Sequence, residues 1–514
     1  MNSRESISSS LMLWNDLPTQ VSIEETYDLK VWPVTNLHNE NPITFNLPPQ
    51  MKGLLADIHI VSKIKIQKNG EDLASSQKDV SVINNLANSF WGEVSVLCAD
   101  RTELCQSMKN AYAYQTFFNH ALNADSNHKD FLYYNESFLM DSGVSKKSEE
   151  DLRTFWKWDN SKDFILDDVA APQGKTETEA KENVKELIWL GKFNVLNNHV
   201  YATGNTSSAR GDKIAYENYL DHKKAWIPTS SNSEASRRGI RFNSGKSVIL
   251  NSRFQNPLFN TSKCLPTNMK IRISLTKNKD EFLLLCNEDA GYSFVLEDCY
   301  LNVTYYKVRD EILSLIEERL LKEPAPYFIS RPEIIARPVT HSSRIIRMSD
   351  IFTDKLPAYA FFALQRGADF DGRFQSNCYS FVPFQKFQFY TNGVPYFNDP
   401  LEVENVTNIG DGEHVYDGFG EYLRQLYRTI GKEIRGDCLI DSTNFHLNFM
   451  VGMSFGADRS SLAERHLNLQ EKASTYLEID MGISDVPEDL LLIVYAVFDS
   501  QIQIDSNRML RIIE

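Results

Sequence analysis

The sequence predicts an all-β protein made of two tandem copies of one β-domain. Three observations support this. Strand-length segments in which apolar residues occupy every second position recur along most of the chain. A unit of strand, polar turn and aromatic helix occurs twice, once within 90–122 and once within 387–430. The chain has 514 residues, more than one hydrophobic core usually supports, so two domains are expected.

The first half opens with a polar segment, 1–17, that is expected to be a flexible arm with an apolar patch at 11–14. Strands follow wherever apolar and polar residues alternate. They are predicted at 27–34, 43–47, 58–66, 93–98, 247–254, 269–275, 281–285 and 293–306. A helix is predicted at 106–122, where aromatic and aliphatic residues keep roughly helical spacing.

Residues 140–245 differ in kind from the rest of the first half. They are polar, charged and interrupted by Gly, Ser, Asn and Pro, and only 187–190 has a strong strand pattern. An irregular region of this length inside a compact domain is normally functional surface or disordered. We therefore expect a long surface insertion in the first domain.

The segment 309–323 predicts an amphipathic helix that Pro324 and Pro326 bring to an end. It is the expected linker between the halves. Beyond it, strands are predicted at 327–335, 343–351, 358–364, 381–390, 445–450, 475–481 and 490–504. A second aromatic helix is predicted at 416–430, with its apolar residues on one stripe.

The two halves can be matched segment by segment and in the same order. The matched pairs are 54–66 with 356–365, 93–98 with 386–390, 112–122 with 422–430, 269–275 with 475–481, and 293–306 with 490–504. About eight strands with a helix between the middle ones fit a jelly roll, in which two four-stranded sheets pack face to face. The prediction is therefore two tandem eight-stranded jelly rolls with short helices: arm 1–17, first jelly roll 18–308, linker helix 309–326 and second jelly roll 327–514.

Composition and charge exclude several classes of function. A net charge of −15 argues against a protein that coats nucleic acid, because such a protein needs a basic face to displace counterions from phosphate. The seven cysteines form no Cys-x-x-Cys pair, so no zinc knuckle or thiol redox motif is expected, and they are predicted to be small buried residues. The N-terminal segment lacks the apolar core of a signal peptide, and no apolar run approaches the ~20 residues of a spanning helix. A soluble protein outside the standard secretory route is expected.

Motifs that suggest catalysis or cofactor binding are incomplete. Gly174-Lys175-Thr176 lacks the first glycine of a phosphate-binding loop. The segment 369–372 lacks the third ligand and the closing Glu of a calcium loop, so a turn is predicted. The ten histidines include no His-Glu-x-x-His motif, and there is no Gly-x-Ser-x-Gly elbow. No catalytic residue, no cofactor and no metal site are predicted.

Runs of like charge are expected to be solvated. The carboxylates at 149–151 and 317–318 fall in a loop and on a helix face. Arg237, Arg238 and Arg241 form the tightest basic cluster, for which a solvated loop is predicted and a phosphate site is the alternative.

Two features suggest surface binding. Arg210, Gly211 and Asp212 lie in the polar insertion, where an integrin-type receptor contact would be exposed, and they are the one candidate surface-contact site. A second Arg-Gly-Asp at 435–437 shows how readily this motif arises by chance. The aromatic-rich segment 374–396 would stack sugars or bases if its rings were exposed, but alternation predicts that most of them are core.

Four segments carry a family resemblance. Residues 18–24 read Pro-Thr-Gln-Val-Ser-Ile-Glu, 238–255 form a basic stretch that leads into a strand, 265–273 form a Leu-Pro-Thr-Asn-Met-Lys-Ile-Arg-Ile strand, and 372–395 form a strand with the turn Thr-Asn-Gly. In these segments the chain resembles the major capsid proteins of the Polinton/Maverick and adintovirus group, in the double-jelly-roll lineage shared with virophages and adenovirus hexon. Residues 154–236 have no match, and Met269 stands near where the family favours Gly-Val.

The resemblance implies a major capsid protein, not an enzyme, that forms pseudo-hexameric homotrimers and tiles an icosahedral shell around double-stranded DNA. The implied partners are further copies of the chain, neighbouring capsomers, penton proteins and minor capsid proteins, with no sequence-specific nucleic acid. A host-surface receptor bound through outer loops is a further candidate. The implied location is the virion capsid, after synthesis in the host cytosol. On this interpretation the insertion 154–236 points outward, and the arm 1–17 lies inward or laterally.

Two other classes of protein stay open at this point. A β-sandwich virion protein of penton or fibre type, which binds glycans or a receptor, would have exposed aromatic platforms and a single jelly roll with an appendage. A jelly-roll enzyme of carbohydrate metabolism would need converging carboxylates or histidines, and no such cluster is visible. The correspondence between the two halves favours the capsid interpretation.

Overall fold

The structure is a computed structural model of the 514-residue chain. It describes residues 20–37, 41–50, 53–74, 80–98, 102–103, 108–140, 194–196, 199–201, 234–261, 263–286, 291–339, 344–353, 355–372, 379, 381–382, 384–402, 420–433, 436–441, 444–445, 448–456, 472–481 and 490–513.

The first half contains two four-stranded antiparallel sheets. One has the order β1 (Ile23–Val31), β13 (Tyr292–Val308), β3 (Gly53–Lys68) and β10 (Val248–Arg253), with the short β4 (Glu71–Asp72) paired to the end of β3. The other has the order β2 (Ile43–Leu47), β11 (Ile271–Lys277), β6 (Trp91–Cys98) and β7 (Thr102–Glu103).

The second half repeats this arrangement. One sheet has the order β14 (Ala325–Pro338), β22 (Leu490–Ile504), β16 (Tyr359–Arg366) and β20 (Val451–Ser454), with β23 (Leu510–Ile513) paired to the end of β22. The other has the order β15 (Ile345–Ser349), β21 (Thr475–Asp480), β17 (Lys386–Thr391) and β18 (Val394–Pro395), with β19 (Leu401–Glu402) also paired to β17.

The strand order is the same in both halves. When the eight main strands of each half are numbered along the chain, one sheet reads first, eighth, third, sixth, and the other reads second, seventh, fourth, fifth. This order is that of a jelly roll. Each of the four matched strand pairs from the sequence, such as 293–306 with 490–504, occupies the same place in its sheet. The predicted fold class, two tandem jelly rolls, is confirmed.

Helices occupy the connections between the strands. They are α1 (Leu86–Ser89), α2 (Ala111–Asn123), η2 (Ser126–His128), α3 (Lys129–Glu136), α7 (Glu234–Ile240), η3 (Asn243–Gly245), α8 (Asp280–Leu283), α9 (Asp310–Lys322), α10 (Gly367–Asp371) and α11 (Gly420–Thr429). Two short ribbons complete the described elements, β5 (Ser81–Val82) with β12 (Leu284–Leu285) and β8 (Asn194–Leu196) with β9 (His199–Tyr201).

Two predicted strands are wrong. Most of 281–285 is helix α8, because Asp280 and Glu281 occupy its first turn, where carboxylates stabilise the helix dipole. The strand predicted at 445–450 begins only at Val451. The side chains of Asn444 and Asn448 bond the carbonyl oxygens of Leu439 and Asn444, and such local bonds compete with strand pairing. The strand predicted at 381–390 is also shorter, since β17 begins at Lys386.

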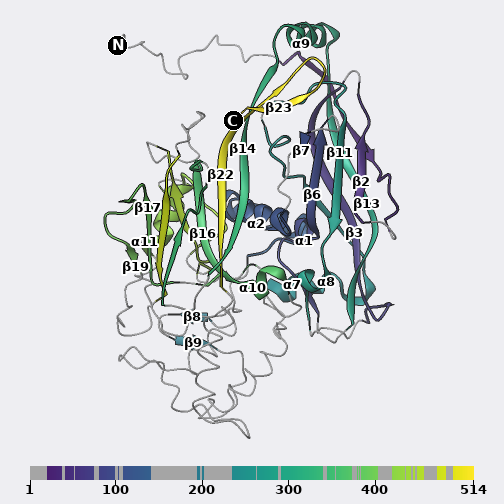
Figure 1. Ribbon diagram of the computed structural model, residues 1–514. Helices are drawn as coiled ribbons and strands as arrows, with labels where there is room; N and C mark the ends of the chain where they lie inside the picture. Colours follow the sequence, from purple (N-terminus) through teal and green to yellow (C-terminus); the bar gives the residue numbers. More distant parts are fainter. Residues whose placement is uncertain are drawn as a thin grey trace, which may run out of the picture.

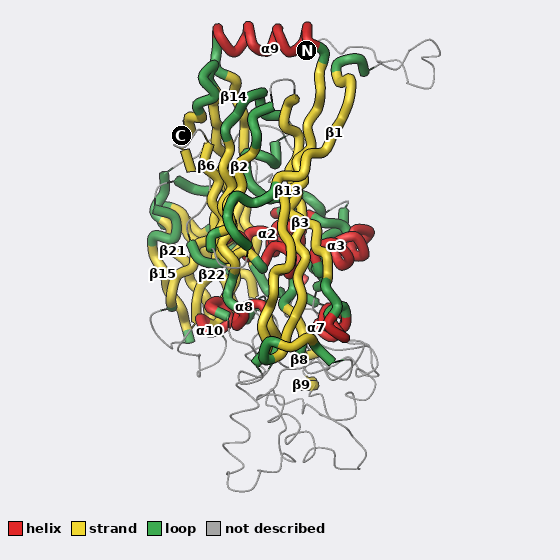
Figure 2. Tube along the Cα trace, turned by 90° about the vertical axis from the view of Figure 1, so that its right-hand side faces the viewer, coloured by secondary structure: helices red, strands yellow, loops and turns green. Residues whose placement is uncertain are grey.

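The molecule has two distinct ends (Figure 1). Helix α9 crosses one end, next to the hairpin of β22 and β23 and the C-terminus (Figures 1 and 2). Helices α7, α8 and α10, which lie in connections between strands, are at the opposite end. The strands run between these ends. The described helices therefore lie at the ends or on the flanks of the two sandwiches.

Candidate assembly surfaces

Helix α2 lies between the two halves (Figure 1). Its sequence is apolar on nearly every side, which is the pattern of a helix that is buried all round. The buried residues are Ala111, Tyr112, Ala113, Tyr114, Thr116, Phe117, Phe118, Ala121 and Leu122. The equivalent helix of the second half, α11, buries only Tyr422, Leu426 and Thr429. The matched helices therefore differ in burial, and α2 fills the space between the two halves.

Aromatic rings fill the contact between α2 and the second half. The ring of Phe118 stacks on Phe381 and on Tyr495, with centroids 5.5 Å and 5.2 Å apart. The ring of Phe117 lies parallel to that of Tyr379, with centroids 4.1 Å apart. Pairs of this kind contribute about 0.5–1.5 kcal/mol beyond the area that they bury. The contact resembles the interior of a domain.

Buried polar groups in the same contact have partners. The hydroxyl of Tyr114 donates to Oε1 of Gln365 at 2.9 Å, and Nδ2 of Asn110 donates to the carbonyl oxygen of Phe370 at 3.0 Å. An unpaired polar group in this position would cost about 1–3 kcal/mol. These bonds fix how the two jelly rolls meet.

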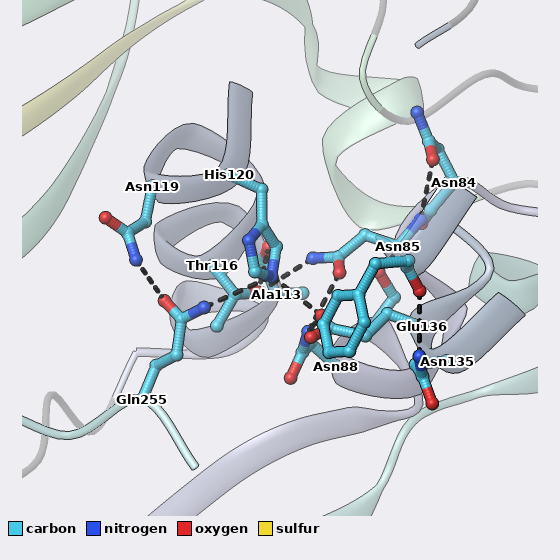
Figure 3. Close-up of polar contacts among 12 residues, drawn as sticks. Asn84, Asn85, Asn88, Ala113, Thr116, Asn119, His120, Asn135, Glu136 and Gln255 are labelled. Atoms are coloured by element: carbon cyan, nitrogen blue, oxygen red, sulfur yellow. Dashed lines mark hydrogen bonds and ion pairs between the residues drawn. The ribbon is translucent and has the colours of Figure 1, made fainter. Parts of the chain in front are cut away.

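A buried polar network holds α2 to its own half (Figure 3). Nε2 of His120 lies 2.7 Å from Oε2 of Glu136, and Nδ2 of Asn88 donates to the same oxygen at 2.7 Å. Nδ2 of Asn85 donates to Oγ1 of Thr116 at 2.8 Å, and Nε2 of Gln255 lies 3.1 Å from Nε2 of His120. Elements α1, α2, α3 and the segment after β10 are thus joined. The side chains of His120 and Glu136 are therefore both engaged in structure.

No group of three His, Cys, Asp or Glu side chains that would hold a metal ion occurs in the described part of the chain. A shallow hollow of about 330 Å³ on the second half is lined by charges of both signs, among them Arg331, Glu333, Lys355 and Asp499. This mixture of charges favours no single class of ligand.

A second contact joins the halves at the α9 end. The guanidinium Nη2 of Arg508, in the turn before β23, lies 2.6 Å from both carboxylate oxygens of Glu317 on α9. Nε of Arg508 donates to the carbonyl oxygen of Thr267 in the first half at 2.9 Å, and Oγ1 of Thr267 donates to Glu317 at 3.0 Å. Glu317 was expected to be a solvated charge, and this expectation is wrong.

In the basic cluster Arg237 is exposed on α7, whereas Arg238 and Arg241 are bound by the protein and are not solvated. Arg238 is fully buried, and its guanidinium donates to the carbonyl oxygens of Val82 at 3.2 Å and Leu139 at 2.9 Å. Arg241 donates to the carbonyl oxygens of Tyr133 at 2.7 Å and Tyr134 at 2.8 Å, at the C-terminal end of α3. Cations stabilise the carbonyl end of a helix. The prediction failed for Arg238 and Arg241 because the sequence does not show which distant backbone carbonyl groups surround them.

The candidate contact residues Arg210, Gly211 and Asp212 lie outside the described residues, as do most of the insertion and the arm 1–17. The second Arg-Gly-Asp has a structural role, because the backbone N–H of Ser126 donates to Oδ2 of Asp437 at 3.0 Å. The segment at 369–372, predicted as a turn, ends the short helix α10, and Asp371 pairs with Lys109 at 3.3 Å.

The aromatic segment of the second half is mainly core. Tyr379, Phe381, Phe384, Phe387 and Phe389 are all buried. Tyr390 and Tyr396 are partly buried. The prediction that most of these rings are core is confirmed for the described residues, and the segment offers no broad stacking platform.

Four of the five described cysteines are buried, as predicted, and none of these four forms a disulfide: Cys98, Cys286, Cys299 and Cys438. Burial raises the pKa of the Cys299 thiol to about 12. A thiol with so high a pKa is a poor nucleophile. This residue acts as a small apolar side chain.

The outward faces of the two equivalent sheets differ. In the second half, Ile334, Phe361 and Tyr495 point away from the sandwich core and are still at most 4% exposed, and Phe118 of α2 stacks on Tyr495. In the first half, the face of the β1-β13-β3-β10 sheet that points away from the core carries Ile249, 61% exposed. Trp32, just beyond β1 and 55% exposed, lies against Tyr300. Strands β1, β13 and β3 lie at the front of Figure 2.

The sequence analysis did not predict that α2 is buried between the two halves. The signal was present, since a helix that buries one face should carry polar residues on the other, and the segment 111–122 carries few.

No described helix has the length and apolarity that a membrane crossing requires.

Comparison with known proteins gives likeness in structure only. No family model matches the chain, and no curated protein matches it in sequence. A chain of the Sputnik virophage, determined by cryo-EM, superposes with a TM-score of 0.52 at 10% identity, covering 100% of this chain and 93% of that one. The Faustovirus major capsid protein superposes with a TM-score of 0.52 at 7% identity, covering 96% of this chain and 92% of that one. The mavirus major capsid protein has a TM-score of 0.45 at 11% identity, covering 100% of this chain and 96% of that one. The Sputnik and Faustovirus chains share the fold with this chain along nearly their whole length.

Proposed function

We propose that the protein is a major capsid protein, whose homotrimers form pseudo-hexameric capsomers of an icosahedral shell around double-stranded DNA. The observation that supports this most is the repeated strand order, which extends over the whole chain and matches the Faustovirus major capsid protein in fold. Two similar wedges per chain and three chains give six wedges, which tile a hexagonal lattice. The role is structural, without catalysis.

The proposed orientation follows from the two ends of the molecule. The end that carries α9 and β23 would face the interior, and the arm 1–17 would lie inward or laterally. The opposite end would face outward. It carries helices α7, α8 and α10 and the insertion 154–236, whose last residues begin α7. We accordingly propose the division into arm 1–17, first jelly roll 18–308, linker 309–326 and second jelly roll 327–514, made in the host cytosol and located in the virion.

The proposed partners are other copies of the chain, neighbouring capsomers, and penton and minor capsid proteins. Host-receptor binding through Arg210, Gly211 and Asp212 is a further proposal for the outer loops. The alternative, a glycan-binding virion protein with one jelly roll, is less well supported because there are two complete sets of eight strands and the aromatic segment is mainly buried.

Light scattering of the purified protein, combined with negative-stain imaging, tests the proposal. A trimer has a mass of three times 59.0 kDa, or 177 kDa, and should have a hexagonal outline. A stable 59.0-kDa monomer that binds a sugar on a glycan array would contradict the capsid function.

A further inference from the structure

The seam inside the chain indicates where a second copy binds. Helix α2 of the first half covers the outward face of the β14-β22-β16-β20 sheet of the second half. The first half has the same sheet, β1-β13-β3-β10, and the second half has a helix, α11, in the same connection as α2. A single chain therefore contains one completed helix-on-sheet contact and both components of a second one.

The matched helices show which face of α11 is involved. Aligning the buried Tyr112 with the buried Tyr422 pairs Tyr114 with Arg424 and Phe118 with Arg428. Tyr114 and Phe118 are the residues through which α2 contacts the second half. Residues four apart lie on the same face of a helix.

Both positions on α11 are solvent-exposed in the single chain. The side chain of Arg424 is 61% exposed and pairs with Glu433 at 3.0 Å, and Arg428 is also exposed. The stripe that α2 uses for the internal seam is thus present on α11 and faces solvent. Its chemistry has changed from aromatic to cationic.

The chemistry of the exposed sheet face suits an arginine stripe. Trp32 and Tyr300 lie together on this face, with ring centroids 5.2 Å apart, and Lys30 already lies over the Tyr300 ring at 4.8 Å. Glu297 adds a carboxylate on the same face, where it already pairs with Lys63 at 3.0 Å and Lys65 at 3.6 Å. Arginine binds both aromatic faces and carboxylates.

The two surfaces lie on opposite flanks of the molecule. Helix α11 is on the outer side of the second half in Figure 1, and strands β1, β13 and β3 are on the outer side of the first half. One copy cannot join its own two surfaces. A contact between different surfaces of successive copies is head-to-tail, and it closes into a ring when the rotation permits.

We infer that Arg424 and Arg428 on α11 of one copy bind the outward face of the β1-β13-β3-β10 sheet of the next copy. This inference rests on the proposed trimer and specifies its interface. It makes the contact between chains the counterpart of the contact that α2 makes within a chain.

Two sets of charge-reversal variants test the interface. The first combines Arg424→Glu with Arg428→Glu, and its matched control combines Arg319→Glu with Lys322→Glu on α9, whose side chains are 81% and 70% exposed. The second set combines Trp32→Glu with Ile249→Glu on the sheet face. The masses are measured by light scattering, and the melting temperatures confirm folding.

We expect 177 kDa for the wild type and the α9 control, and 59.0 kDa for both interface variants. An equimolar mixture of the two interface variants retains one intact contact, so cross-linking should trap a dimer of twice 59.0 kDa, or 118 kDa, that neither variant forms alone. Trimeric interface variants, or a mixture without this dimer, would overturn the inference. A monomeric wild type would instead contradict the proposed function itself.

Discussion

Phe118 shows how much a single side chain contributes to this architecture. It is fully buried, and its ring is shared between Phe381 and Tyr495 of the other half. Its loss therefore affects the contact between the halves as well as the core. The contact depends on shape as well as on apolar area, because the neighbouring Phe117 ring is also stacked.

We predict that Phe118→Ala lowers the free energy of unfolding by about 3–5 kcal/mol, the usual cost of truncating a buried aromatic ring. Urea unfolding measures the change. Phe131→Ala is the matched control, because Phe131 is 58% exposed on α3 and its loss should cost less than about 0.5 kcal/mol. Equal effects of the two substitutions would show that the ring stack does not matter.

The seam should also respond to acid through Asp437. Hydrogen bonds from Ser126 hold the pKa of this carboxyl below its ordinary value, although burial opposes them. A lowered pKa gives a stabilisation that is present above the ordinary pKa of about 3.9 and is lost as pH falls through the lower folded value. Wild type should therefore melt above Asp437→Asn at pH 7, and the difference should shrink towards pH 3. A difference that is constant over this range would contradict the prediction.

At the scale of elements, the linker helix is tied into both halves. Arg508 from the second half, Glu317 from α9 and Thr267 from the first half form one hydrogen-bonded cluster. The side chain of Arg508 is 14% exposed and that of Glu317 is 37% exposed, so water screens the pair only in part. The orientation of α9 thus depends on residues distant in sequence.

We predict that Arg508→Gln lowers the free energy of unfolding by about 1–3 kcal/mol, because the carboxylate of Glu317 loses its charged partner. Chemical unfolding followed by fluorescence measures the loss. Arg511→Gln, at an exposed position of the same hairpin, is the control and should change stability by less than about 0.5 kcal/mol. A similar loss in the control would assign the effect to the hairpin as a whole.

The strands that could be predicted from sequence are those with a clear pattern over many residues. The long apolar strand β22 has the bounds predicted for it, 490–504, and α9 was predicted to within one residue at each end. Short segments failed, because in 281–285 carboxylates in the first helical turn, and in 445–450 side-chain bonds to the backbone, outweigh alternation. The contact surfaces could not be predicted, because burial of Arg238 or α2 depends on which distant segments meet.

At the scale of the whole molecule, the second half depends on the first for cover. Ile334, Phe361 and Tyr495 on its outer face are at most 4% exposed, and Phe118 of α2 stacks on Tyr495. A jelly roll with such residues on its outer face exposes an apolar patch when its neighbour is absent, and such a patch promotes aggregation. The chain is therefore one folding unit as well as two domains in tandem.

We predict that residues 327–514 expressed alone aggregate or bind a hydrophobic dye, and that co-expression with residues 18–323 restores a soluble complex. Size-exclusion chromatography and dye fluorescence measure these outcomes. A monomeric second half that binds no dye would show that α2 is dispensable.

The inequality between α2 and α11 restricts the geometry of any closed shell. In the proposed ring, one contact is aromatic and lies within a chain, whereas the next is the inferred cationic contact between chains, so two kinds of contact must alternate. Alternation requires an even number of wedges around each axis, and six satisfies it. Five is odd, so a fivefold vertex cannot be built from this chain by the same contacts. The proposed shell would therefore need a different molecule at each of its corners.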